Sequence, residues 1–167
     1  QIFFVTEQGG EGGSALMRSR IGTIIYVAVE GTARLEGYIN RVQVLYAPGT
    51  PGVDRPDRMD VILSIHNQGN THMIPEGEVV VHDEHGQAVA TLRLVKGWGL
   101  LPRQEDNYHA IGNGVHLREG RYSLDVRIRA GEDLGQLILM TKTLEMEVDA
   151  KGNARLIEPP PAPPPAP

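Results

Sequence analysis

Apolar and polar residues alternate along several short segments of this chain, and this pattern constrains its fold more than any other feature. In residues 58–66 every second residue is apolar, and residues 122–129 repeat the pattern. A period of two residues is typical of a β-strand with one buried face. Similar strand-like segments cover residues 34–45, 78–82, 87–94, 137–140 and 143–148. No segment beyond residue 30 has the 3.6-residue period of an amphipathic helix, so the sequence predicts an all-β fold.

Six or seven short strands separated by turn signals favour a β-sandwich, which we place at residues 31–150. Residues 83–86 supply one such turn, with Gly86 at the position that favours positive φ. Tyr122 begins a strand directly after a glycine turn. This placement is typical of the tyrosine corner of immunoglobulin-like domains, in which the hydroxyl bonds to nearby backbone. The alternative is an ordinary half-buried strand tyrosine.

The two ends of the chain differ from this central region. Residues 151–167 form a predicted Pro/Ala-rich tail, and the last nine residues contain only Pro and Ala. Such a segment favours polyproline II and acts as a linker or passive tail. The alternative is a motif that docks in an aromatic groove. Residues 1–30 read as a β-hairpin with a wide glycine-rich connection at residues 9–13.

Two strands alone are marginally stable in water, so this opening hairpin is expected to pair with other strands. The partner could be the rest of the chain, a second copy or another protein. Along residues 14–27 the alternating set Ala15, Met17, Ser19 and Ile21 gives the outer strand an apolar side. An edge strand of this kind accepts a partner strand through its backbone amides and carbonyls. An ordinary internal strand is the equally weighted alternative.

Composition excludes several classes of function. The sequence contains no Cys, which excludes disulfides, Fe–S clusters and thiol catalysis, and its net charge of −5 disfavours nucleic acid and anionic lipid as partners. No apolar run approaches the ~20 residues that span a bilayer. The sequence lacks a nucleophile elbow, a P-loop and a dinucleotide fingerprint, so we expect no enzyme activity and no cofactor. The absence of an initiator Met suggests a processed or excised piece.

Three local features invite a sharper interpretation, and in each the structural alternative is favoured. His82 and His85 flank two carboxylates, but they span a turn, so we expect a solvated turn and no metal site. Residues 67–72 form a polar loop whose amides are expected to bond locally rather than to a ligand. Trp98, between two glycines, is expected to cap the core rather than to serve as a binding platform.

Residues 3–6 and 15–26 together resemble the end of the first domain in periplasmic pilus-assembly (PapD-like) chaperones. In this chain those segments read Phe-Phe-Val-Thr and Ala-Leu-Met-Arg-Ser-Arg-Ile-Gly-Thr-Ile-Ile-Tyr. The family has two immunoglobulin-like domains. The resemblance implies that residues 1–30 are the closing hairpin of a truncated first domain, followed by a second sandwich. It is specific over roughly 25 residues and general elsewhere.

The resemblance also implies a mechanism, in which the chaperone strand lends alternate apolar side chains to an incomplete pilin fold. By position, Ala15, Met17 and Ile21 would contact the partner strand. The family usually anchors the subunit's terminal carboxylate with a basic residue, but that position falls on Gly22 here. Arg18 and Arg20 are the candidate replacements, and Arg20 would require a register shift of two residues.

The sequence therefore predicts a non-enzymatic, chaperone-like protein of the bacterial periplasm or cell surface. It would bind pilus or surface subunits by β-strand pairing, and a homodimer through residues 1–30 is a further expectation. The alternative is a structural or adhesion immunoglobulin-like module of a cell-surface protein, with the Pro/Ala tail as its stalk.

Overall fold

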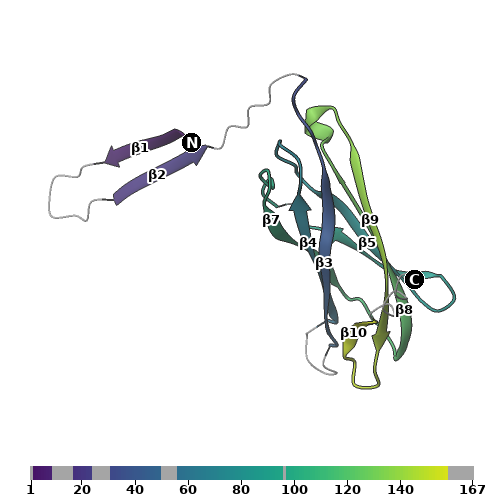
Figure 1. Cartoon of the computed structure of the whole chain (residues 1–167). Helices are drawn as coiled ribbons and strands as arrows, with labels where there is room; N and C mark the ends of the chain where they lie inside the picture. The colour runs from purple at the N-terminus through teal and green to yellow at the C-terminus, as the bar shows by residue number, and fades with distance from the viewer. Residues whose placement is uncertain (1, 9–16, 24–30, 50–55, 96, 158–167) are drawn as a thin grey trace, which may run out of the picture. The chain divides into compact units, whose positions relative to one another are not determined.

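The computed structural model describes residues 2–8, 17–23, 31–49, 56–95 and 97–157. The chain divides into two compact units, Gln1–Thr32 and Ala33–Pro167. The first unit is a two-stranded antiparallel sheet of β1 (Ile2–Gln8) and β2 (Met17–Thr23), as Figure 1 shows. The predicted hairpin is confirmed in these residues, and its glycine-rich connection lies outside them.

The second unit contains eight strands and one short helical turn. The strands are β3 (Gly37–Ala47), β4 (Arg58–Asn67), β5 (Glu76–His82), β6 (Ala88–Leu94), β7 (Glu105–Asn113), β8 (Gly120–Ala130), β9 (Ile138–Val148) and β10 (Ala154–Ile157). A single 3₁₀ turn at Glu132–Leu134 is the only helical element among the described residues. The prediction of an all-β fold is confirmed.

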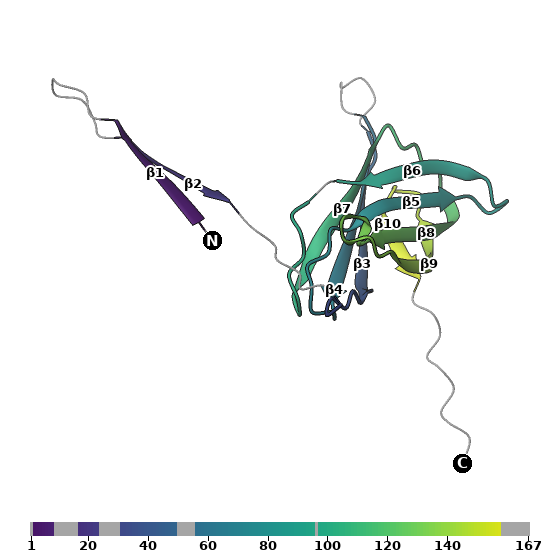
Figure 2. The same cartoon turned by 90° about the horizontal axis from the view of Figure 1, so that it is seen from above.

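All neighbouring strands of this unit are antiparallel, in the order β10-β9-β8-β5-β6-β7-β4-β3. Only two residue pairs join β6 to β7, Arg93 with Ile111 and Leu94 with Ala110. The order therefore divides into one layer from β10 to β6 and a second layer of β7, β4 and β3. Figure 2 shows the strands of the two layers crossing one another. Because β3 also approaches β9 and β10, the β-sandwich is nearly closed into a barrel.

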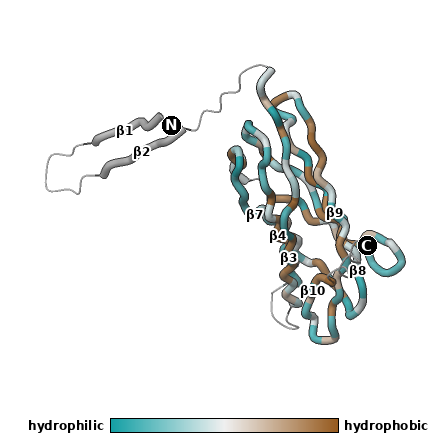
Figure 3. The backbone as a smooth tube through the Cα atoms, viewed as in Figure 1, coloured by the Kyte–Doolittle hydropathy of each residue, from teal (hydrophilic) through white to brown (hydrophobic). Residues whose placement is uncertain are grey.

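The core lies between the two layers and follows the alternation in the sequence. In β4 the apolar positions of the pattern, from Met59 to Ile65, are fully buried. Val79 and Val81 of β5 and Leu124, Val126 and Ile128 of β8 face them from the other layer. Figure 3 shows the corresponding alternation of hydrophobic and hydrophilic residues along the strands. Burial of these side chains on one face of each layer is the main favourable term in folding.

The tyrosine corner is confirmed. The hydroxyl of Tyr122 accepts a hydrogen bond from the backbone N–H of Arg118 at 3.0 Å and donates one to the Arg118 carbonyl at 2.9 Å. Tyr46 on β3 binds the same loop from the other layer. Its hydroxyl accepts a hydrogen bond from the backbone N–H of Leu117 at 3.0 Å. The loop before β8 is thus held by two phenol groups.

Some elements differ from the sequence prediction. β7 was not predicted at all. For residues 137–148 the pattern left open one strand or a pair, and residues 138–148 form one continuous strand. Within β7 only Tyr108 and Ala110 are buried, and its first residues are all polar, so its alternating signal is weak. The segment predicted as tail from residue 151 contains β10, which pairs with β9. The sandwich therefore continues to Ile157, and residues 158–167 lie outside the described part of the chain.

Candidate functional site

The predicted partner-binding strand is β2, whose residues Met17, Arg18, Arg20 and Ile21 are all placed in the hairpin. Within the described residues β2 pairs with β1 alone, so its second edge has no strand beside it. Alternation along a strand puts Met17 and Ile21 on one face of the hairpin and the two arginines on the other. The remaining predicted contact residue, Ala15, lies outside the described residues.

The register of the hairpin distinguishes the two arginines. Arg18 is paired with Glu7 of β1, whereas Arg20 is paired with Val5. Directly paired residues of an antiparallel ladder share a face. An acid thus stands at the position opposite Arg18, and an apolar residue stands opposite Arg20.

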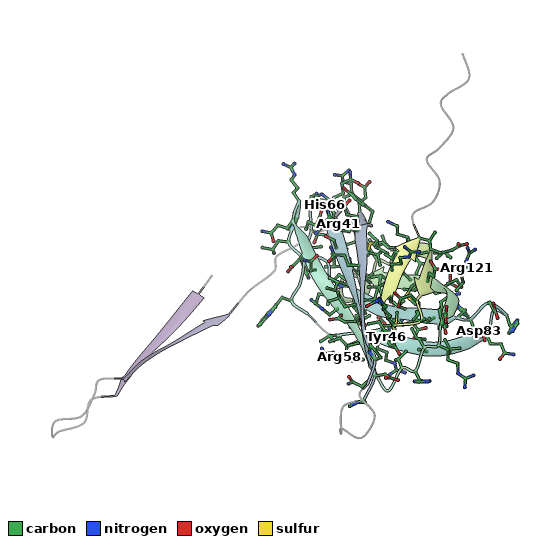
Figure 4. The ribbon with its side chains drawn as sticks, turned by 90° about the horizontal axis from the view of Figure 1, so that it is seen from below. Arg41, Tyr46, Arg58, His66, Asp83 and Arg121 are labelled. Atoms are coloured by element: carbon green, nitrogen blue, oxygen red, sulfur yellow. The ribbon has the colours of Figure 1, made fainter. Side chains whose placement is uncertain are left out.

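The segment with His82 and His85 is a turn, as predicted. The Asp83 carboxylate accepts hydrogen bonds from the backbone N–H groups of His85 and Gln87, both at 2.9 Å. Figure 4 shows Asp83 at the tip of the hairpin formed by β5 and β6. The side chain of His85 is 75% exposed. Among the described residues no group of three or more His, Cys, Asp or Glu side chains is arranged to hold a metal ion.

The polar loop at residues 67–72 is a structural junction, which confirms the prediction of local bonding. The fully buried Asn67 donates from Nδ2 to the carbonyls of Thr71 and Leu100, at 2.8 and 3.0 Å. Its Oδ1 accepts the backbone N–H of Gly69. A Cβ at Gly69 would lie 2.2 Å from the carbonyl oxygen of Arg34. Only glycine therefore lets the two backbone segments lie this close together.

The expectation that Trp98 caps the core is wrong, because this residue is 83% exposed. The loop backbone itself covers the core at this point. Tyr108, which is 5% exposed, donates its hydroxyl hydrogen to the Trp98 carbonyl at 3.0 Å. A Cβ at Gly97 would lie 3.1 Å from the Tyr108 ring. Tyr108 therefore fills the core position beneath the loop, and the indole is left on the surface.

A polar network that the sequence did not predict lies on the outer face of β3, β4 and β7, centred on Glu105. The Ser64 hydroxyl donates to Oε1 of Glu105, and Nδ2 of Asn40 lies 3.1 and 3.0 Å from its two carboxylate oxygens. His66 Nδ1 is 3.7 Å from Oε2. These hydrogen bonds, from Ser64 first and then Asn40, lower the pKa of Glu105, with smaller contributions from the charges of His66 and Arg41.

A β-bulge in β3 builds one side of this network. The pairing with β4 shifts between Ile39, which pairs with Ile65, and Arg41, which pairs with Ser64. The additional residue, Asn40, is exposed, and so is Arg41, while Ile39 is buried. Strict alternation would turn one of these two polar residues inward. The bulge instead places both on the outer face, and bulges are common next to functional sites for this reason.

The network combines Ser, His and Glu, but its bonds do not follow the order of a hydrolytic triad. In such a triad the serine donates to the histidine, which the carboxylate orients. Here Ser64 donates directly to Glu105. Ser64 and His66 occupy outward positions in the alternating pattern of β4, which is a usable sequence signal. Glu105 gives no comparable signal, because it lies in the strand that the pattern missed.

Comparisons with known proteins give little further information. No family model matches the sequence, and no curated protein is similar to it. A solved structure, described as the X-ray structure of Northeast Structural Genomics Consortium target SoR45, is 12% identical with a TM-score of 0.44. The match covers 71% of this chain and 88% of that chain. A similarity of this size supports no inference about fold or function.

Among the described residues the structure contains no helix that is both long enough and apolar enough to cross a membrane.

Proposed function

We propose that this protein is a non-enzymatic, chaperone-like module of the bacterial periplasm or cell surface that binds an extended strand of a pilus or surface subunit. The observation that carries the proposal is the edge of β2, which has no neighbouring strand among the described residues. Backbone N–H and C=O groups at such an edge pair readily with another chain. Strand addition obtains its affinity from these groups and its specificity from alternate side chains.

The residues of β2 suit this role. Met17 and Ile21 share a face and supply the apolar contacts, while Ser19 between them is small. On the opposite face Arg20 is the better candidate for a carboxylate anchor, because Arg18 is paired with the acidic Glu7. An arginine beside a strand edge can bind a terminal carboxylate through two parallel hydrogen bonds.

The test is co-expression of the full chain with pilus or surface subunits from the same genome, followed by size-exclusion chromatography. We expect one subunit to elute with the chain, and Met17→Glu to abolish this complex because it places a charge in the apolar contact. Thr141→Glu, on an exposed position of β9, is the matched control and should retain binding. Unchanged binding by the Met17→Glu variant would exclude β2 as the binding strand.

A second copy of the chain is the other candidate partner for this edge of β2. A homodimer through residues 1–30 would satisfy β2 without a foreign partner. Light scattering at rising concentration distinguishes the cases, since a strict monomer at high concentration argues against self-pairing. A monomer of this kind that still binds a subunit would favour the chaperone-like role.

One observation favours a structural or adhesion module as the second candidate function. The unit Ala33–Pro167 has its own core and its own tyrosine corner, so it has the features of an independent immunoglobulin-like domain. Domains of this kind serve as spacers in tandem arrays. A full-length gene product with several similar domains, and no subunit that binds the Met17 edge, would favour this candidate.

A further inference from the structure

The outer face of β3, β4 and β7 contains two hollows that adjoin at Asn107. The first, of about 240 Å³, lies over Arg41, Gln43, Ser64 and Glu105 as well as Asn107. The second, of about 290 Å³, extends from Asn107 to Trp98. Together they fall within the roughly 300–1,000 Å³ that small-molecule sites occupy.

Strand register explains why these residues come together. Arg41 of β3, Ser64 of β4 and Asn107 of β7 form one row across the sheet. Gln43 lies in the next row of β3 on the same face. Figure 4 shows Arg41 and His66 at the same end of this layer. The row thus belongs to paired strands rather than to loops, and sites on such strands hold their side chains more precisely.

Part of the hollow is already fixed, and part of it is available to a ligand. Ser64 and Asn40 hold the Glu105 carboxylate in place. Among the described residues the side chains of Arg41, Gln43 and Asn107 form no hydrogen bond. An amide side chain both donates and accepts hydrogen bonds, as a hydroxyl group does. The available groups therefore match a ligand that is rich in hydroxyls.

The charges of the first hollow point to an uncharged ligand. Arg41 contributes one positive charge. Glu105 contributes one negative charge, since a glutamate is ionised at neutral pH and the hydrogen bonds from Ser64 and Asn40 lower the pKa of this one further. A ligand with a net charge would meet one attractive and one repulsive group here, whereas a neutral polar ligand meets two strong hydrogen-bonding partners.

Trp98 supplies the apolar part of the site. Trp98 is 83% exposed, and Val95 in the same hollow is 51% exposed, so the two form a small exposed apolar area. An exposed apolar area that is rimmed by polar residues marks an interaction site. The Tyr108 hydroxyl fixes the backbone beneath it. An indole face beside amide groups fits a ligand with an apolar C–H face and a polar rim, which is the chemistry of a sugar ring. We propose that this face binds a neutral carbohydrate, with Trp98 as the stacking platform.

The chain offers a direct probe, because Trp98 is its only tryptophan. The full chain is titrated with neutral oligosaccharides of the cello-, malto-, xylo- and chito-series, and Trp98 fluorescence and calorimetric heat are both recorded. We expect at least one series to shift the fluorescence and to bind with a measurable heat. Asn107→Ala and Gln43→Ala should each lower that affinity at least tenfold, and Trp98→Ala should abolish the heat of binding.

Thr141→Ala is the matched control, since this exposed position lies on the other layer; it should bind like the unaltered chain. Asn107 and Gln43 are exposed, and an unchanged melting temperature will show that both variants remain folded. The proposal is overturned if no series binds, or if Asn107→Ala and Gln43→Ala both bind as the unaltered chain does. Binding of acidic saccharides alone would also overturn it. Because Met17→Glu should leave carbohydrate binding intact, this outcome is independent of strand pairing.

Discussion

Oδ2 of Asp57 and Nδ1 of His116 lie 2.7 Å apart and join two loops at one end of the sandwich. Oδ1 of the same carboxylate accepts the backbone N–H of Gly49, just beyond β3. The Gly49 bond first, and the His116 contact second, lower the pKa of Asp57 from its ordinary value of 3.8. One side chain thereby joins both ends of the connection between β3 and β4 to the loop before β8.

The lowered pKa of Asp57 sets the sign of its pH dependence. A carboxyl group whose folded pKa lies below its unfolded value stabilises the fold above that unfolded value, and this contribution is lost as the pH falls through the folded pKa. We expect Asp57→Asn to lower stability at neutral pH. The unaltered chain should lose further stability as the pH falls below 3.8, the ordinary pKa of the Asp57 carboxyl. The Asp57→Asn variant should show a smaller loss of stability over the same pH range.

Urea unfolding at neutral pH and in acid measures both effects on Asp57→Asn. Glu119→Gln, at an exposed site on the loop before β8, is the control and should follow the unaltered chain at both pH values. Equal acid sensitivity of Asp57→Asn and the unaltered chain would contradict the assignment.

The tyrosine corner provides a second prediction. Tyr122→Phe removes the hydroxyl that bonds both backbone groups of Arg118, so we expect a loss of about 1–3 kcal/mol in the free energy of unfolding. Tyr38→Phe is the control, because Tyr38 is 43% exposed and its hydroxyl forms no hydrogen bond among the described residues. Chemical denaturation compares the two, and an equal effect of both variants would show that the corner adds nothing specific.

Two glycines beside the short helical turn form a matched pair for a third prediction. Gly131 and Gly135 have φ values of 95° and 65°, in the region that costs other residues roughly 1–2 kcal/mol. A Cβ at Gly135 meets nothing within 4 Å, whereas a Cβ at Gly131 would lie 2.0 Å from Leu35 and 2.7 Å from the Gln136 carbonyl. Gly135→Ala should therefore lower stability by about that amount, and Gly131→Ala by clearly more.

Thermal melting ranks the two glycine variants. If Gly135→Ala proved the more destabilising of the two, the close packing of Gly131 against Leu35 would be excluded as the dominant constraint.

A charged residue on the inner face of β9 gives the fourth prediction. Lys142 is half-buried and shares that face with Met140 and Leu144. It lies in the part of β9 that β10 does not reach, since β10 pairs only with residues 145–148. An inward-pointing charge protects such an edge from unwanted strand addition. We expect Lys142→Met to raise stability by about 1 kcal/mol and to promote self-association.

Sedimentation velocity and thermal melting test Lys142→Met together. Thr141→Met adds a similar side chain at the neighbouring exposed position and serves as the control. Self-association of Thr141→Met to the same degree would attribute the effect to surface hydrophobicity rather than to the inner-face charge.

The elements that the sequence could predict are those with a strong alternating signal. β4 and β8 carry large apolar residues at every second position, so their existence and inner faces follow directly from the pattern. Tyr122 could be named as a candidate corner residue, beside the alternative of an ordinary strand tyrosine, because its position relative to the preceding glycine is local information. β7 was missed because its inner face carries only Tyr108 and Ala110, which give a weak period.

The polar site could not be predicted for a related reason. Ser64 and Glu105 meet only because β4 pairs with β7, and strand pairing is a long-range property. The bulge at Asn40 interrupts the alternation of β3, so an unbroken period of two residues does not show that Asn40 and Arg41 both lie on the outer face. Trp98 was assigned to the core because its residue type favours burial, whereas its loop backbone already covers Tyr108.

The ladder of only two residue pairs between β6 and β7 has a consequence for how the domain unfolds. Every ladder within a layer has at least four residue pairs, so less shared backbone resists a separation of the layers at this corner. Mechanical or thermal opening should therefore separate the two layers while each sheet stays intact, and it is complete only when these two pairs break. The indole of Trp98, on the connection between the same two strands, would register this separation.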